Sequence, residues 1–132
     1  MVYLSDGRLK ENILNNVVGL DFILNLKPVT YNYNFKAIDP KSQNNNIRYS
    51  GFIAQEVEQT AKKVNYDFSG VDIPKNENDF YSLRYAEFVV PIVKSIQEQQ
   101  KTIEALKLEL ELQKQKNEAL EKRLKAIEEK LK

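Results

Sequence analysis

The chain has 132 residues, a net charge of +1, and neither cysteine nor histidine. This composition excludes disulfides, thiolate metal sites and a cysteine nucleophile, and it removes the usual zinc ligands. The near-neutral charge gives no reason to expect a nucleic-acid or anionic-membrane partner, and no apolar run is long enough to span a membrane. We therefore expect little more than one domain, and no metal, cofactor, nucleic acid or membrane.

A serine and a lysine stand five positions apart near the start of the chain, in the hexapeptide Ser-Asp-Gly-Arg-Leu-Lys at residues 5–10. A serine hydroxyl is a weak nucleophile until a base takes its proton, and a lysine whose pKa is lowered by partial burial can be that base. Because the chain has no histidine, no other general-base arrangement is available to a serine. The alternative interpretation is a solvated turn followed by ordinary basic residues.

A helix is predicted after this hexapeptide. Apolar residues at helical spacing predict it over residues 11–27, with Asp6 as a fair N-cap and Pro28 after its end. Gly19 marks either an interruption or the start of a second short helix.

Two strands joined by a loop follow. Apolar and polar residues alternate over 29–35, which is the period of a half-buried strand. Residues 36–46 are polar and rich in asparagine, and they predict a loop. Residues 47–53 predict a second strand that pairs with the first as a long-looped hairpin. Gly51 in this strand indicates a bulge or a close backbone approach.

One helix and short strands are predicted next. Residues 54–61 predict a helix with Ile53, Val57 and Ala61 on one face. Residues 64–79 have no sustained period, and they predict a loop with one or two short strands. Residues 80–83 predict a strand edge before the last element.

The last element is one long helix from about Tyr85, and Pro91 either kinks it or marks its real beginning. Its residues repeat with a heptad period, in which ten of the thirteen a and d positions are apolar. The charged residues at g and at the following e positions attract each other in identical parallel strands. The a positions are Val89, Ile96, Ile103, Leu110, Asn117, Leu124 and Leu131, and the d positions are Ile92, Gln99, Leu106, Gln113, Leu120 and Ile127.

These elements predict an α+β fold with two domains. A head of small helices and antiparallel strands occupies residues 1–84, and a parallel coiled-coil stalk occupies residues 85–132. Asn117 at an a position costs stability but fixes the register. The a and d residues form the predicted oligomerisation surface, and their mixture leaves dimer and trimer open.

Five motifs stand in a specific order along the chain. They are Ser-Asp-Gly-Arg-Leu-Lys-Glu-Asn-Ile at 5–13, Leu-Lys-Pro-Val-Thr-Tyr at 26–31, Gly-Phe-Ile-Ala-Gln-Glu-Val at 51–57, Tyr-Ser-Leu-Arg-Tyr at 81–85, and Phe-Val-Val-Pro-Ile-Val-Lys-Ser-Ile-Gln-Glu at 88–98. The chain thereby resembles the C-terminal intramolecular chaperone domains of phage tailspikes, tail fibres and endosialidases. That family of autocleaving serine peptidases also includes bacterial fibre-like proteins and a eukaryotic membrane-bound transcription factor. The first and third motifs are the most specific.

The resemblance implies a homotrimer that templates the folding of an upstream fibre or spike segment and then cuts itself off. It places the protein in a phage tail fibre or tailspike precursor, or in a bacterial fibre-like surface protein. Carried over to matching positions, Ser5 is the nucleophile and Lys10 is the general base. Asp6 and Arg8 belong to the motif without an assigned role, although Arg8 is placed to orient Asp6 or to contact a neighbouring protomer.

Ring size indicates which bond is cut. Attack by the Ser5 hydroxyl on the carbonyl of Leu4 passes through a five-membered ring, whereas attack on its own carbonyl needs a strained four-membered ring. The predicted activity is therefore one self-cleavage per molecule at the Leu4–Ser5 bond, without an external substrate. A trimer also permits Lys10 to act on a neighbour's serine. The alternative is a non-catalytic trimerisation or adhesion module of a fibre protein, in which both residues are structural.

Overall fold

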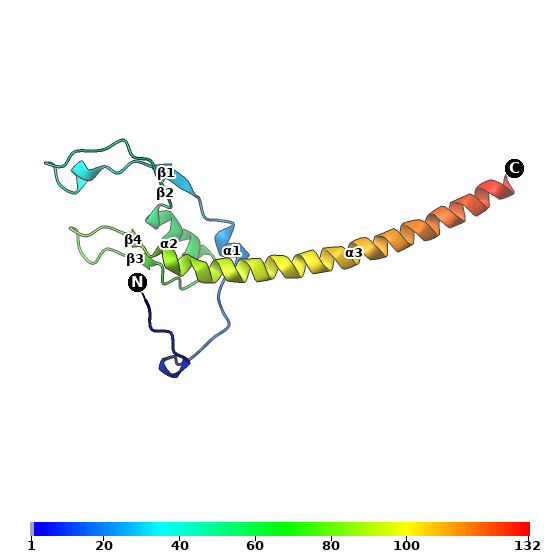
Figure 1. The fold of residues 1–132 in the computed structure, drawn as a ribbon, viewed down its shortest axis with the longest axis horizontal. Coiled ribbons are helices and arrows are strands. Elements are labelled where there is room, and N and C mark those ends of the chain that lie inside the picture. The colour runs from blue at the N-terminus through cyan, green and yellow to red at the C-terminus, as the bar shows by residue number, and fades with distance from the viewer. Residues whose placement is uncertain (1) are drawn as a thin grey trace.

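The computed structural model describes residues 2–132, and it shows short elements gathered around the base of one long helix (Figure 1). We divide the chain into an arm (2–17), a body (18–98) and a stalk (99–132). The predicted α+β class, with antiparallel strands and a long C-terminal helix, is confirmed. The helices are α1 (Leu20–Ile23), α2 (Ala54–Lys63) and α3 (Val89–Lys130), the strands are β1 (Val29–Tyr31), β2 (Tyr49–Gly51), β3 (Val71–Asp72) and β4 (Ser82–Leu83), and 3-10 turns cover Gly7–Leu9, Phe35–Ala37 and Tyr85–Phe88.

Both strand pairs are antiparallel and shorter than the sequence predicts. β1 pairs with β2, with Val29 opposite Gly51, which confirms the long-looped hairpin. The backbone pairing of the two strands ends at Tyr31. Beyond it a side-chain hydrogen bond joins the two segments, since the Asn32 side chain donates to the carbonyl of Ile47 at 2.7 Å. β3 pairs with β4 in a second two-stranded sheet. The two strands lie in the segments 64–79 and 80–83, where short strands are predicted from the sequence.

The helix predicted over residues 11–27 is wrong except for the four residues of α1. Asn12 has a φ of 54°, a left-handed conformation that interrupts any right-handed helix at that point. Every residue from 2 to 16 is exposed, so an apolar helical face here would have no surface to bury against within one chain. The arm therefore runs as an irregular segment on the outside of the body (Figure 1).

The core of the body is small and aromatic. Val57 and Ala61 of α2 are buried as predicted, whereas Ile53 is 46% exposed. The backbone N–H of Tyr66 donates to the carbonyl of Ala61 at 2.9 Å, across the left-handed residue Asn65, and this Schellman-type ending turns the chain back toward α1. The buried apolar cluster consists of Phe22, Val57, Ala61, Phe68 and Phe88.

The first turns of α3 are part of the body. Phe88, Pro91 and Ser95 are buried, and the Glu98 carboxylate accepts a hydrogen bond from the backbone N–H of Leu20 at 3.1 Å. Pro91 lies in the first turn of α3, where its missing N–H has no helical partner to lose, so it marks the beginning of the helix. Every residue from 99 to 132 is exposed in the single chain. The division at residues 84 and 85 stays a prediction, but the packing of the body reaches Glu98.

The stability of the body should be sensitive to a methyl group at Gly51. A Cβ built on Gly51 meets the hydroxyl oxygen of Tyr85 well inside van der Waals contact, and that oxygen also accepts the backbone N–H of Phe52 at 3.1 Å. We expect Gly51→Ala to lower the free energy of unfolding by about 1–3 kcal/mol, because the Tyr85 ring must move. Urea unfolding measures this loss. Gly7→Ala is the control, since nothing lies within 4 Å of its Cβ position, and an equal effect of both substitutions would contradict the prediction.

Candidate functional site

A single 3-10 turn organises the hexapeptide at residues 5–10. The turn covers Gly7–Leu9, and the Asp6 carboxylate caps it by accepting the backbone N–H of Arg8 at 2.9 Å. The backbone N–H of Leu9 donates to the carbonyl of Asp6 at 3.0 Å, and that of Lys10 donates to the carbonyl of Gly7 at 3.2 Å. Asp6 is thus a cap, as predicted, although it caps a 3-10 turn and not a long helix.

The turn is reinforced by a two-pronged ion pair between Asp6 and Arg8. The Arg8 guanidinium donates from Nη2 to Asp6 Oδ2 at 2.8 Å and from Nε to Oδ1 at 3.1 Å. The hydrogen bonds from the Arg8 side chain and backbone hold the pKa of the Asp6 carboxyl below its ordinary value. Both side chains face solvent, so their contribution to global stability is small. Their effect is local, because they fix the shape of the turn.

This turn brings Ser5 and Lys10 together. Lys10 Nζ donates to Ser5 Oγ at 2.7 Å, although the two residues are five positions apart in the sequence. Both residues are exposed on the arm. A lysine can take the proton of a serine only in its neutral form, which removal from water favours. The Ser5 and Lys10 side chains are in contact, but one chain alone does not shield them from water.

The stability of the turn should depend on pH through the Asp6–Arg8 ion pair. Because the pKa of Asp6 is lowered in the folded chain, the stabilisation of the turn is present above the ordinary value of 3.8 and is lost as the pH falls through the lower folded value. Arg8→Gln should move the Asp6 titration midpoint up toward the ordinary value. The carboxyl carbon shift of Asp6, followed by NMR in both proteins, measures this. Arg48→Gln is the control, and an unchanged midpoint in Arg8→Gln would contradict the assignment.

A second candidate surface runs along α3. The predicted a and d residues of the stalk all face solvent in the single chain. The body packs on a different side of the helix, through Phe88 and Ser95 at g positions and Pro91 and Glu98 at c positions. The a and d residues next to the body are also exposed, since Val89, Ile92 and Ile96 lie outside its core. The a and d stripe is therefore uncovered from the body to the end of α3, and it is apolar except at Gln99, Gln113 and Asn117.

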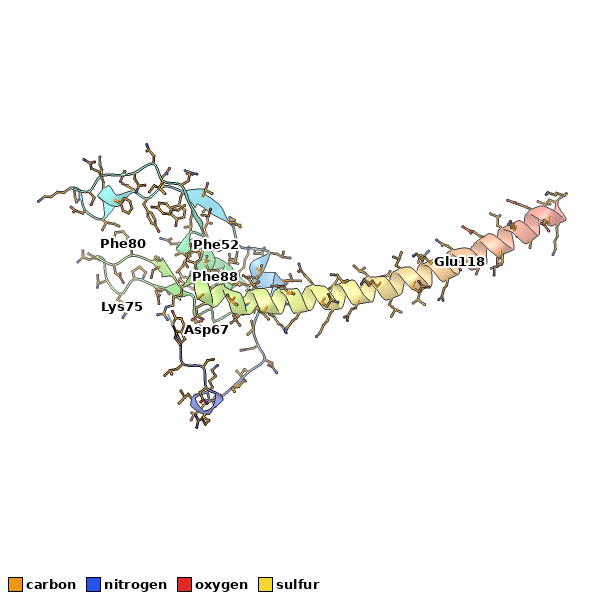
Figure 2. The ribbon with its side chains drawn as sticks, in the orientation of Figure 1. Phe52, Asp67, Lys75, Phe80, Phe88 and Glu118 are labelled. Carbon is orange, nitrogen blue, oxygen red and sulfur yellow. The ribbon has the colours of Figure 1, made fainter. Side chains whose placement is uncertain are left out.

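The way in which the body is joined to α3 was not predicted from the sequence. Phe52 from the Gly-Phe-Ile-Ala-Gln-Glu-Val motif stacks on Phe88 with ring centroids 5.2 Å apart, and Tyr85 stacks on both rings. Figure 2 shows Phe52 and Phe88 together at the base of the long helix. The only signal in the sequence was an aromatic residue at a g position, where a coiled coil ordinarily has a polar one. This motif thus fixes the helix to the body.

No group of three or more potential metal-ligating side chains is found within residues 2–132. Over the same described range, no helix combines the length and apolar character needed to cross a membrane.

The protein thus combines a serine–lysine turn on an exposed arm with a small body and a long helix whose a and d positions are uncovered in the single chain. Residues 5–66 match the model of the family described as "Chaperone of endosialidase", and the resemblance predicted from the sequence is confirmed over that segment. The match covers 62 of the 132 residues of the chain. It contains the hexapeptide and the Gly-Phe-Ile-Ala-Gln-Glu-Val motif, and it ends before α3. No curated protein and no solved structure matches the chain significantly.

Proposed function

We propose that this chain is a C-terminal intramolecular chaperone that trimerises, assists the folding of an upstream fibre or spike segment of the same polypeptide, and releases itself by one cleavage. The observation that carries the proposal is the 2.7 Å contact between Lys10 Nζ and Ser5 Oγ, inside a segment that matches the chaperone family. Lys10 is the general base and Ser5 is the nucleophile, while Asp6 and Arg8 hold the turn that brings them together.

The proposed reaction is an acyl shift followed by hydrolysis. Neutral Lys10 takes the hydroxyl proton of Ser5 as Oγ attacks the carbonyl carbon of Leu4. The five-membered intermediate collapses when the Leu4–Ser5 C–N bond breaks, and the leaving amine takes the proton back from the Lys10 ammonium. The resulting ester joins Leu4 to Ser5 Oγ. Water, deprotonated by Lys10, then opens this ester to give a carboxylate on Leu4 and a free amine and hydroxyl on Ser5.

This reaction needs an assembled protein, because the base must be neutral. Removing an ammonium ion from water favours its neutral form, and one chain leaves Lys10 exposed. The open a and d stripe of α3 supports assembly through a parallel coiled coil, which would bring three arms and three bodies together at one end. The contact between Ser5 and Lys10 within one chain supports cleavage in cis.

The direct test is to express the domain with its natural upstream segment and to weigh the products. We expect a folded trimer and two fragments separated at Leu4–Ser5. An intact chain in folded trimers would overturn the cleavage proposal. A non-catalytic trimerisation or adhesion module remains the competing function, because an exposed Lys10 is also what a structural turn would show.

A deletion separates a chaperone from a plain oligomerisation module. It should remove residues 99–132, because Phe88 to Glu98 contribute to the packing of the body. Loss of soluble, folded upstream fibre would support the chaperone. An unaffected upstream fold would favour the plain module.

A further inference from the structure

Two valines at the start of α3 are apolar at positions where the rest of the helix is polar. Val90 is a b position and Val93 is an e position, and they are 52% and 48% exposed. A coiled-coil seam needs apolar residues at a and d only. All later b and e positions carry Gln, Glu or Lys. The first two turns of α3 therefore expose a wider apolar surface than the seam uses.

These valines line a groove against the arm. Its volume is about 230 Å³. Its remaining walls come from Leu14, Asn15 and Val17 on the arm side and from Lys94 and Gln97 on α3. The groove lies beside the a and d stripe, so a partner that pairs along the stripe reaches it. The arm that forms one wall also carries Ser5 and Lys10.

The heptad positions indicate which part of a neighbouring copy faces this groove. In parallel strands in register, a g residue of one copy faces the e residue five positions later in the next copy. Phe88 is a g residue, and its e partner is Val93 of the next copy. Phe88 is buried under the body of its own chain. The body of one copy therefore lies opposite Val93 of the next, and this relation holds for a parallel dimer and for a trimer.

We propose that the groove formed by Leu14, Val17, Val90 and Val93 receives the body of the neighbouring copy. This inference rests on the parallel assembly in the proposed function, and it adds a second interface that is separate from the stalk. The neighbouring body packs against the arm and fixes the segment that holds Ser5 and Lys10. The stalks can then pair first, and the cleavage site is shielded only when the bodies have packed together.

Photo-crosslinking from position 93 tests the inference. The chain has no cysteine, so Val93→Cys offers one attachment point for a benzophenone maleimide. Trimers are refolded from a mixture of ¹⁵N-labelled and unlabelled full chains, so that mass spectrometry distinguishes crosslinks between copies from those within one copy. Leu108→Cys, at an outward f position of the stalk, is the matched control. We expect crosslinks between copies from position 93 to residues 18–72, which lie outside the turn next to the seam, and none to that range from position 108.

The outcomes separate this inference from the proposed function. An intact oligomer in which position 93 crosslinks only within its own chain, or only to the upstream segment, overturns the groove and leaves the proposed function standing. A monomer overturns the proposed assembly and the groove with it. As a second readout, Val93→Lys should preserve the oligomeric mass and slow cleavage at least tenfold, whereas Leu108→Lys should change neither. Unchanged cleavage in Val93→Lys trimers would also contradict the proposal.

Discussion

Ser5→Ala should abolish release of the domain from its upstream segment while the protein still folds and assembles. The substitution removes the only atom that attacks the Leu4 carbonyl in the proposed reaction, and loss of such a nucleophile slows catalysis by a factor on the order of 10⁴ or more. Ser5 is exposed, and its Oγ is joined to Lys10 alone among the side-chain hydrogen bonds described, so little stability is lost with it. The measurement is the mass of the purified products over days.

Lys10→Arg separates a catalytic lysine from a structural one. A guanidinium retains the positive charge and can donate to Ser5, but it is not deprotonated in proteins and cannot act as a base. We expect no cleavage in this variant, whereas a purely structural role would tolerate arginine. Ser50→Ala and Lys36→Arg, which change exposed residues of the body, are the matched controls. Normal cutting in either Ser5→Ala or Lys10→Arg would remove that residue from the mechanism.

The local features of the fold could be predicted from the sequence because each rests on neighbouring residues. The helix α2 follows from its apolar period, although it runs two residues beyond the predicted end at residue 61. The contact between Ser5 and Lys10 belongs to this class, since a single turn accounts for it. The long helix could be read from its heptads for the same reason.

The failed predictions depend on contacts that one chain does not make or that join distant residues. The segment 11–19 has helical spacing, but a helical face forms only where it can be buried, and the arm has no such surface within one chain. The stacking of Phe52 on Phe88 joins residues that are far apart in sequence, and no periodicity of the sequence predicts such a contact. The packing of the body reaches Glu98 through α1, since the backbone N–H of Leu20 donates to the Glu98 carboxylate, and this contact also joins residues far apart in sequence.

A second large effect is expected in the stalk, from substitution of a leucine at an a position. A leucine at an f position is the control, because the two are similarly exposed in a single chain. Leu110 is an a residue and 57% exposed, whereas Leu108 is an f residue and 64% exposed. In a monomer, replacing either leucine with lysine should change almost nothing. In a parallel coiled coil, Leu110→Lys places an ammonium group from every copy in one apolar layer, and the lost burial alone is worth about 2–5 kcal/mol per leucine.

We therefore expect Leu110→Lys to dissociate the trimer at micromolar concentration and to stop cleavage, while Leu108→Lys leaves both unchanged. Sedimentation equilibrium gives the mass, and product analysis gives the cleavage. Equal loss of assembly in both variants would mean that the seam does not follow the a and d positions. Normal cleavage by a monomeric Leu110→Lys protein would show that Ser5 and Lys10 need no neighbour. Dissociation with loss of cleavage in Leu110→Lys alone would tie the chemistry of the arm to the pairing of the stalk, because the substitution lies far along the chain from both reacting groups.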